Sequence, residues 1–562
     1  MPSGRESMGT PERRFSFRGR PYSARDGESL LSVLARDRIP LLHRSIQYHR
    51  PQGPFCGVGH CTGCLVRVNG RPNVRACRYE PGPGDSVTTE NAWPSPNLDL
   101  LAGIGLLTPR GVDSLHGLRR PAFATPLFQR MVRRLAGTGA PPTEAAARGI
   151  AAPALERAAD VTVVGAGTSG RAVVAALVAR GVRPVVLERA LRPPPLSGAE
   201  LLAGTTAVFL PPPTEGEDRR FELLAYREPA QGVRLLTRSV VVATGGYDTS
   251  LLFGGNDRPG VMTADAALSL APPPRRPPFR RAVVVGGGRR AAQLLAACGE
   301  SVEAVIAPGE IRPEVVRVAN EHGVLLYPRS LLLSALGRRR VRSVHLRARA
   351  GGPDTRIACD AVVLAHRRIP HAQLFFQAGA AMEWRESIAA YAPTVFPDGG
   401  TNIPGLFVVG SAAGVIPSDE VRQAETVAGS VVGKTASPGP SASSAPVPEG
   451  PTELLGYYRE LLREPGHGKW VACPCVDVLF SEVEKAVGAG YRGIEVIKRY
   501  TSLGTGVCQG RYCLPDTLLL LSLLEDRPPP EVGYITQRPP VVPTPLAALA
   551  ALPAPVPAEA VP

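Results

Sequence analysis

Four cysteines near the N-terminus have a spacing that can hold a redox centre. They are Cys56, Cys61, Cys64 and Cys77, in the order C-x4-C-x2-C followed by twelve residues and a fourth Cys. Four thiolates in this order form a ligand set for a [2Fe–2S] cluster. The sequence therefore predicts a cluster here and a chain that moves electrons.

Small residues and the spacing favour this interpretation over its alternatives. Gly57, Gly59 and Gly63 stand where a side chain would crowd the iron or the sulfides. Zinc also takes four Cys, but structural zinc sites usually pair C-x2-C with a second C-x2-C. Disulfides suit a short secreted chain. Zinc and disulfides stay open as alternatives.

A second group of cysteines lies near the C-terminus: Cys473, Cys475, Cys508 and Cys513. The pattern is C-x-C and C-x4-C, separated by 32 residues in which 480–487 and 493–500 have helical spacing. We predict a second [2Fe–2S] cluster, with zinc or a vestigial site as alternatives.

A dinucleotide-binding pattern begins with the apolar strand 161–164. The strand leads into G-x-G-x-x-G and a helix, and a second strand ends in an acid. The first glycine makes the turn, the second lets the pyrophosphate approach the helix N-terminus, and the third permits close packing. The acid can accept hydrogen bonds from the ribose. The residues expected to bind the dinucleotide are Gly165, Gly167, Gly170 and Glu188.

A second unit of this kind starts at Ala282 and contains Gly286 and Gly288 in a G-x-G-x-x-A pattern. This pattern would suit NAD(P), and Arg289 and Arg290 could favour a phosphate. Its second strand ends without the acid that NAD would want. A retained fold with a lapsed site is the alternative.

Two further strand ends resemble segments of flavoproteins with two dinucleotide-binding domains. An apolar strand ends in Thr244-Gly245, which passes the flavin in such proteins. Another ends in Gly410-Ser411, where the flavoprotein pattern has Gly-Asp and the Asp binds the ribityl chain. Ser411 offers a hydroxyl without charge. The resemblance implies FAD.

Composition sets bounds on the function. The 562 residues carry a formal charge of +15, which suits anionic cofactors and acidic partner surfaces. No nucleic acid-binding pattern accompanies this charge, so we expect no nucleic-acid partner. No secretory signal and no apolar run long enough to span a membrane are visible, and we expect a cytoplasmic protein.

Four segments resemble the sarcosine oxidase alpha-subunit family, which includes hydrogen cyanide synthase A and B, opine oxidases and dye-linked proline or hydroxyproline dehydrogenases. They are 44–53, 93–95, 255–262 and a C-terminal segment made of 498–501 and 504–511, and residues 121–139 also resemble the family's short helical link into the flavin domain. The resemblance implies an FAD-dependent complex that oxidises a C–N bond in a secondary amine or amino acid such as sarcosine, an opine, proline or glycine. It also implies a separate beta-type flavoprotein subunit as the site of substrate oxidation. This chain would relay electrons to an acceptor that the sequence does not identify, and no catalytic residue is assigned.

The expected fold is multidomain, α/β and α+β. We expect a plant-type, β-grasp [2Fe–2S] ferredoxin domain (13–98), a connector (99–158) and a two-dinucleotide-domain flavoprotein fold (159–435). A linker (436–468), a small helical [2Fe–2S] domain resembling bacterioferritin-associated ferredoxin (469–526) and a Pro-rich tail outside any core (527–562) follow.

Two other functions fit parts of the sequence. One is a stand-alone NAD(P)H-dependent reductase that passes electrons through FAD to the clusters. The other is a non-enzymatic assembly subunit whose nucleotide sites have lapsed, for which Ser411 and the missing acid are the arguments.

Overall fold

The computed structural model describes residues 13–103, 152–214, 219–270, 277–349, 351–414, 420–433 and 451–552. The chain divides into two compact units, and each is built from three separate stretches of sequence. Unit 1 contains 1–147, 248–367 and 452–534, and unit 2 contains 148–247, 368–451 and 535–562. The chain passes between them within β16 (Gly246–Asp248) and just before β25 (Arg368–Pro370).

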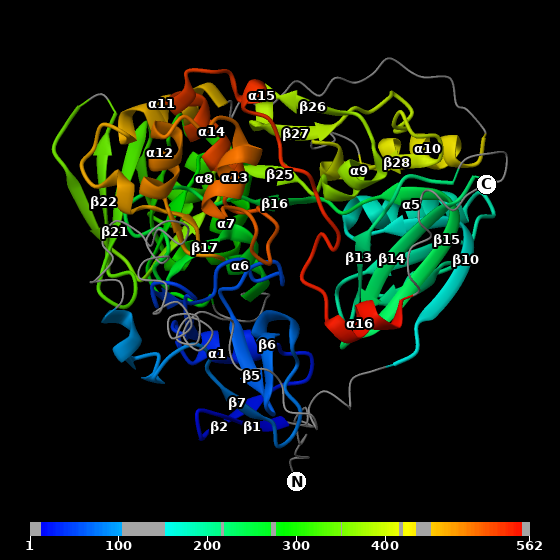
Figure 1. The fold of residues 1–562 in the computed structure, drawn as a ribbon, viewed down its shortest axis with the longest axis horizontal. Coiled ribbons are helices and arrows are strands. Elements are labelled where there is room, and N and C mark those ends of the chain that lie inside the picture. Colours follow the sequence, from blue (N-terminus) through cyan, green and yellow to red (C-terminus); the bar gives the residue numbers. More distant parts are fainter. Residues whose placement is uncertain are drawn as a thin grey trace, which may run out of the picture. The chain divides into compact units, whose positions relative to one another are not determined.

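The N-terminal part of unit 1 is a five-stranded sheet in the order β2-β1-β7-β5-β6 with a helix, α1, packed on it (Figure 1). Alternation in β1 buries Phe15 and Phe17. Ser29 caps α1 by accepting a hydrogen bond from the N–H of Ser32 at 3.1 Å. The elements are β1 (Arg13–Phe17), β2 (Arg20–Ala24), α1 (Leu30–Arg36), β3 (His43–Arg44), β4 (Pro51–Gln52), β5 (Leu65–Val68), β6 (Arg71–Arg75), β7 (Ser86–Thr88), β8 (Pro94–Ser95) and β9 (Leu98–Asp99).

The middle part of unit 1 is a parallel sheet in the order β17-β24-β18-β19-β20, accompanied by a three-stranded antiparallel sheet β21-β22-β23. The strands β18 and β24 are continuous apolar runs, because both of their faces are buried. The elements are β17 (Val261–Thr263), α6 (Ala264–Leu270), β18 (Ala282–Val285), α7 (Arg289–Cys298), β19 (Val302–Ile306), α8 (Pro313–Glu321), β20 (Leu325–Tyr327), β21 (Ser330–Leu336), β22 (Ser343–Ala348), β23 (Thr355–Ala358) and β24 (Ala361–Leu364).

The C-terminal part of unit 1 is mainly helical. It contains α11 (Pro451–Leu461), β29 (Val471–Cys473), β30 (Val478–Leu479), α12 (Phe480–Gly488), α13 (Ile494–Thr501), α14 (Leu514–Glu525) and α15 (Pro529–Val532). The predicted linker 436–468 is wrong in its second half, because 451–461 is helical and buries Tyr457, Tyr458 and Leu461. Tyr457 and Tyr458 give this helix an apolar face. The proline-rich stretch before it led the sequence analysis to extend the linker through the helix.

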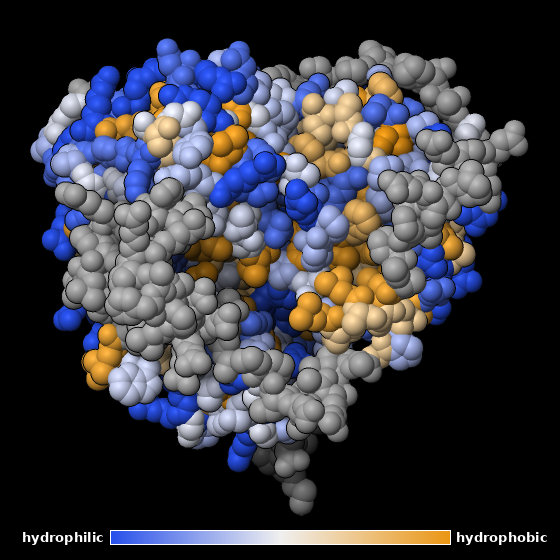
Figure 2. All heavy atoms as spheres, in the orientation of Figure 1, coloured by the Kyte–Doolittle hydropathy of each residue, from blue (hydrophilic) through white to orange (hydrophobic). Residues whose placement is uncertain are grey.

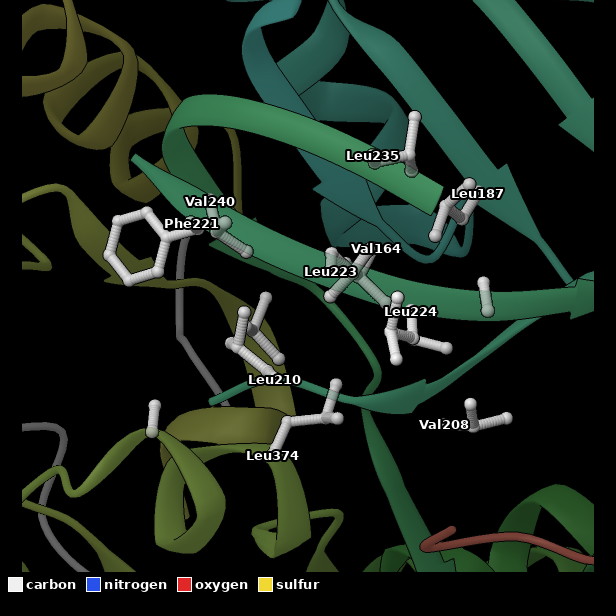
Figure 3. Packing of buried hydrophobic residues seen from close by; sticks show 14 of the residues in the cluster. Val164, Leu187, Val208, Leu210, Phe221, Leu223, Leu224, Leu235, Val240 and Leu374 are labelled. Atoms are coloured by element: carbon white, nitrogen blue, oxygen red, sulfur yellow. The ribbon is translucent and has the colours of Figure 1, made fainter. Parts of the chain in front are cut away.

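Unit 2 is built on a mixed sheet in the order β12-β11-β10-β15-β14-β13, with β28 paired to β15, and also contains the two-stranded sheet β26-β27. Leucines, valines and Phe221 fill its main core (Figure 3). The elements are β10 (Leu155–Val164), α5 (Thr168–Val178), β11 (Val185–Glu188), β12 (Glu200–Ala203), β13 (Thr205–Phe209), β14 (Phe221–Arg227), β15 (Gln231–Val242), α9 (Gln373–Ala378), β26 (Met382–Arg385), β27 (Ala390–Pro393), β28 (Leu406–Val408), α10 (Glu420–Val431) and α16 (Leu546–Ala551).

Part of the predicted Pro-rich tail belongs to this core, contrary to expectation. The N–H of Val541 donates to the carbonyl of Val208 at 3.0 Å, and Val541, Val542 and Ala548 are buried. Apolar residues between the prolines supply the buried surface. α16 also leaves Leu546 81% exposed, and hydrophobic surface gathers over this helix in Figure 2.

Most of the predicted connector 99–158 lies outside the described residues, as does the first half of the predicted linker. Within the described ranges, the helices are all too short or too polar to cross a bilayer.

Candidate functional site

The first cysteine group is buried and arranged in two pairs. Cys56, Cys61 and Cys64 are almost fully buried, and Cys77 is half-buried. The thiols of Cys56 and Cys61 hydrogen-bond to each other, and so do those of Cys64 and Cys77. The loop that precedes β5 supplies Cys56, Cys61 and Cys64, and the short turn after β6 supplies Cys77.

Backbone N–H groups in this loop point at sulfur. The N–H of Cys61 lies 3.4 Å from Cys56 Sγ, and that of Gly63 lies 3.3 Å from Cys61 Sγ. Burial raises the pKa of Cys56, but hydrogen bonds from Cys61 and from neighbouring backbone N–H groups bring it down to about 6. At Cys56 the loop therefore favours the thiolate, the form that binds iron, whereas the hydrogen bond to the partner cysteine and burial raise the pKa of Cys61 and of Cys77.

The loop glycines are required by contacts with the protein itself. A Cβ on Gly57 would lie 2.6 Å from Ala266 Cα in α6, and one on Gly63 would lie 2.4 Å from the carbonyl oxygen of Gly53. A Cβ on Gly59 would lie 2.7 Å from the side chain of Arg78. Close packing of the loop within unit 1 therefore accounts for these positions.

The second cysteine group has the same two-pair arrangement. Cys473 hydrogen-bonds to Cys513, and Cys475 to Cys508, and all four are buried. The pKa of Cys508 falls to about 7, chiefly through the hydrogen bond from Cys475 and against the effect of burial, with Arg511 adding a positive charge nearby.

A glycine and a buried arginine shape this second group. A Cβ on Gly506 would lie 2.5 Å from Cys475 Cβ, so only glycine fits there without rearrangement. Arg511 is 3% exposed, and its Nη1 donates to the carbonyl of Cys508 at 3.2 Å. A buried cation beside thiolates stabilises their negative charge.

The two cysteine groups lie next to each other within unit 1. The rings of Phe55 and Tyr512 meet edge to face at 5.2 Å, and each ring directly neighbours a cysteine in sequence. Cys61 and Cys475 are close enough for the charge of Cys475 to contribute to the raised pKa of Cys61. Tyr512 is buried, and burial followed by the charges of the first group raises its pKa.

A single carboxylate joins the two domains that carry these groups. Asp477 is fully buried two residues after Cys475. It accepts hydrogen bonds from Ser45 Oγ at 2.6 Å, from the N–H of Tyr48 at 2.7 Å and from Arg50 Nε at 3.0 Å. One side chain thus satisfies several donors of the N-terminal domain.

The segment 255–262, noted above only for its family resemblance, contacts both domains. Asn256 pairs with the backbone of Val471 in both directions, at 2.9 and 3.1 Å. Asp257 forms an ion pair with Arg50 at 3.4 Å. This segment is therefore a structural support for the paired cysteine groups.

The arrangement fits two bridged irons in each group. One tetrahedral zinc ion would need its four ligands to converge, whereas a [2Fe–2S] cluster takes its four cysteines as two pairs. The buried pairs and the N–H groups aimed at sulfur meet the second requirement.

The first glycine-rich turn, in unit 2, is open at the position where a pyrophosphate would approach. Gly165 has φ +106°, and a Cβ there would lie 2.5 Å from the carbonyl oxygen of Ala243. A Cβ on Gly170 would lie 2.1 Å from the carbonyl oxygen of Gly165, but one on Gly167 would meet no atom within 4 Å. The first and third glycines are therefore needed for packing, and the second leaves free space.

The other predicted flavin residues of unit 2 gather at the same sheet edge. Val164, Val242 and Val408 are level across the parallel strands β10, β15 and β28. Gly165, Thr244 and Gly410 therefore follow neighbouring carboxyl ends, which is where open α/β sheets bind ligands.

Two contacts complete this edge. The carboxylate of Glu188 accepts hydrogen bonds from the N–H groups of Ala166 at 2.7 Å and Ala190 at 2.8 Å. Gly410, which precedes Ser411, would contact Ser169 Oγ at 2.3 Å if it carried a Cβ. Gly245 has φ +67° and open space around it. Unit 2 thus brings its sequence-predicted residues to one edge of its sheet.

The second glycine-rich turn, in unit 1, is covered by its own chain. Gly286 makes the expected sharp turn, with φ +139°. A Cβ on Gly287 would lie 2.3 Å from the carbonyl oxygen of Glu310, and the N–H of Arg312 donates to the carbonyl of Gly287 at 2.9 Å. The segment after β19 thus lies against the turn.

Arg290, considered above as a phosphate ligand, is held by two carboxylates. Its guanidinium donates to the buried Asp248 at 3.1 Å and contacts Asp265 closely. Gly288 begins α7, so the fold of a dinucleotide-binding unit is present. Its residues give no support to the predicted NAD(P) role.

Sequence reasoning missed three residues of the paired site: Asp477, Arg511 and Tyr512. The signal that could have found them is their position, since each lies within three residues of a predicted ligand. A charged or aromatic residue so close to a cluster ligand is an indication of a buried partner.

Comparison with known proteins places the domains. Residues 12–92 match the family described as 2Fe-2S iron-sulfur cluster binding domain, residues 214–430 match pyridine nucleotide-disulphide oxidoreductase, and residues 469–552 match the sarcosine oxidase A3 domain. The first match contains all four cysteines of the N-terminal group, and the last contains the second group.

Individual relatives agree with these domain matches. The alpha subunit of sarcosine oxidase from Rhizobium meliloti (strain 1021) is 27% identical over 95% of this chain and 57% of its own length. The hydrogen cyanide synthase subunit HcnA of Pseudomonas aeruginosa is 41% identical over 13% of this chain and 69% of its own length. This chain thus spans a little more than half of the sarcosine oxidase alpha subunit.

A solved structure shares the fold. L-proline dehydrogenase from P. horikoshii superposes with a TM-score of 0.67 at 19% identity, covering 97% of this chain and 98% of that one. The comparisons confirm the combination of a [2Fe–2S] domain with a flavoprotein fold of mixed α/β content, and hence the predicted FAD and [2Fe–2S] cofactors.

Proposed function

Because the chain belongs to the sarcosine oxidase alpha-subunit family, we propose that it is the electron-relaying, alpha-type subunit of an amine- or amino-acid-oxidising complex. The substrate class is a secondary amine or amino acid of the sarcosine, opine, proline or glycine kind. A beta-type flavoprotein subunit is the proposed partner and the site of substrate oxidation. The observation that carries the relay is the adjacency of two buried cysteine groups in unit 1.

The residues of unit 1 hold and insulate the proposed relay. Cys56, Cys61, Cys64 and Cys77 would hold one [2Fe–2S] cluster, and Cys473, Cys475, Cys508 and Cys513 a second. Such clusters carry single electrons. Phe55 and Tyr512 pack edge to face beside the two groups, and Tyr512 is fully buried there. Asp477 fixes the two domains at a constant separation.

The residues of unit 2 would orient a dinucleotide. Gly167 leaves space for a pyrophosphate at the start of α5, and Glu188 would accept hydrogen bonds from the ribose hydroxyls. FAD bound there supplies the exchange between two-electron and one-electron chemistry. The same edge of the sheet would also contribute Thr244, Gly245, Gly410 and Ser411 to the flavin site.

Two finer assignments belong to the same proposal. The sheet order β2-β1-β7-β5-β6 with α1 supports a β-grasp, plant-type ferredoxin domain. The helices α12, α13 and α14 among the second cysteines support a domain like bacterioferritin-associated ferredoxin.

Metal and flavin analysis of the purified chain tests the relay. We expect about four irons and one flavin per chain, since two [2Fe–2S] clusters contain two irons each. Cys64→Ser and Cys508→Ser should each lower the iron content to about half. Cys298→Ser is the matched control, because Cys298 is a buried thiol outside both groups.

Electron paramagnetic resonance of the reduced chain tests the adjacency. Two clusters that lie side by side should show spin–spin broadening, and either cysteine variant should sharpen the signal of the remaining cluster. Zinc in place of iron, or two sharp independent signals in the unmodified chain, would contradict the proposal.

A further inference from the structure

A groove rich in arginine lies within unit 1. Its volume is about 870 Å³. The N-terminal domain contributes Arg18, Arg20 and Arg38 to its lining, and the turn between β21 and β22 contributes Arg338–Arg340 and Arg342. Among the described residues, the lining contains no Asp or Glu. Seven positive charges therefore face one concave surface.

Most of this charge has no acidic partner in the part of the chain that the structure describes. Arg38 approaches a carboxylate, Asp360, at 3.8 Å, whereas the other six arginines have none within 4 Å. Arg18 Nε is buried without a hydrogen-bond partner. The nearby Arg44 is affected as well, because burial, and then the charge of Arg339, lower its pKa against the effect of Asp99.

The basic surface continues beyond the groove. A second hollow of about 380 Å³ shares Arg38, Arg340 and Arg342 with the groove. It adds Arg280, Arg281 and one acid, Asp360, and Arg281 pairs with Glu303 at 2.7 Å. Two connected hollows with arginines from several elements make a surface wider than a small anion needs. This breadth favours a protein with an acidic face, since complementary charge steers such partners together.

The groove also connects to the first cysteine group by a short route. Arg18 Nη2 donates to the carbonyl of Leu41, which lines the groove, at 3.3 Å. Two residues further on, His43 Nε2 lies 2.6 Å from the carbonyl oxygen of Thr62. Thr62 lies between the ligands Cys61 and Cys64, so the groove wall and the cysteine loop are parts of one hydrogen-bonded assembly.

We propose that this groove docks an acidic, one-electron carrier protein that exchanges electrons with the cluster at Cys56–Cys77. The proposal rests on the function proposed above and names the class of its electron partner. In the exchange, one electron passes between the carrier and the cluster, which changes between its oxidised and one-electron-reduced forms, and no bond forms or breaks.

An acidic flavodoxin serves as the probe. Under anaerobic conditions, its hydroquinone should reduce the oxidised cluster of the full chain while becoming the semiquinone, and stopped-flow absorbance reports the rate. We expect the second-order rate constant to fall roughly tenfold between low and physiological ionic strength, because salt screens steering charges. Arg339→Glu/Arg340→Glu should lower it by about tenfold more at low salt.

Arg14→Glu is the matched control, because Arg14 is an exposed arginine of β1 outside the groove. It should change the rate less than about twofold. The methyl viologen radical should reduce every variant at least as fast as the unmodified chain. If the radical bleaches no cluster band, the relay has failed instead. In that case, fluorescence anisotropy of labelled flavodoxin measures binding alone. We expect Arg339→Glu/Arg340→Glu to weaken this binding by about tenfold.

Three results would overturn the docking proposal. One is flavodoxin binding or reduction that does not depend on salt. Another is an equal loss in Arg14→Glu and in the groove variant. The third is release of flavodoxin by micromolar tripolyphosphate, which would assign the groove to a small polyanion.

Discussion

Two glycine-rich turns in this chain, 165–170 and 286–291, follow a buried parallel strand and lead into a helix. In the first, a Cβ on Gly167 would meet nothing within 4 Å. In the second, Gly287 lies against the backbone of Glu310 and Arg312, and Arg290 is held by Asp248 and Asp265. The first turn leaves space for a ligand, and the second is filled by the protein.

The difference separates what the motif determines from what its surroundings determine. Gly165 and Gly286 both adopt positive φ, so the motif specifies a sharp turn in both places. Whether a phosphate can reach that turn depends on the segment after the second strand. After the turn at 165–170, the second strand is β11, which ends in Glu188. After the turn at 286–291, the second strand is β19, which leads into a loop that packs on the turn.

Removing Arg290 should have the largest effect on stability. Arg290→Ala leaves the buried Asp248 without its cation, so we expect the free energy of unfolding to fall by about 3 kcal/mol. Flavin content should not change if the turn at 286–291 serves only the fold and binds no nucleotide. Denaturant unfolding and flavin absorbance measure the two effects. Arg289→Ala, at the exposed neighbour, should cost less than about 0.5 kcal/mol. Loss of nucleotide binding without loss of stability would reverse the assignment.

A pair of alanine substitutions should separate folding from binding. Gly287→Ala overpacks against Glu310 and should cost about 1–3 kcal/mol with flavin retained. Gly167→Ala has room for its methyl group and should unfold like the parent, but its flavin should dissociate more readily because the methyl group blocks the pyrophosphate. Melting curves and flavin content read the two outcomes. Equal stability and equal flavin content in the two variants would contradict the proposed difference between the turns.

Glu188→Gln should weaken flavin binding by about tenfold while preserving shape. The carboxylate accepts hydrogen bonds more strongly than an amide, and a lost charge-assisted bond to a ribose hydroxyl is worth about 1.5 kcal/mol. Titration of the flavin-free chain with FAD measures the affinity. An unchanged dissociation constant would show that Glu188 serves only the backbone of Ala166 and Ala190.

The smallest effect is expected at Ser411. Ser411→Asp restores the carboxylate of the flavoprotein pattern and should tighten FAD binding by about threefold, whereas Ser411→Ala should loosen it by a similar factor. The same titration applies. Weaker FAD binding by Ser411→Asp would show that the flavin site requires an uncharged side chain at position 411.

Local patterns made much of this fold predictable. The cysteine spacing at 56–77 and the glycine pattern at 165–170 each act over a few residues, because a loop or turn needs particular side chains at particular steps. Apolar runs such as 282–285 likewise indicate buried parallel strands. The comparisons confirmed the family and the cofactor types that these patterns implied.

Long-range partners were not predictable in the same way. Nothing near Cys61 in sequence indicates Cys475, and nothing near Tyr48 indicates Asp477. The covering of Gly287 depends on a loop whose residues look ordinary by themselves. The burial of Val541 and Val542 was not predicted, because the many prolines around them indicated an extended tail outside any core. Such features depend on pairs of residues rather than on periodicity.

The contact between Ser45 and Asp477 joins residues 432 positions apart. During synthesis, the loop 45–50 leaves the ribosome long before the carboxylate that its N–H groups require. Closing so large a loop is also slow, since chain entropy opposes it until the late contacts form. The N-terminal domain therefore gains its last contacts only after Asp477 has been synthesised, so the two cysteine-bearing domains complete their folding together.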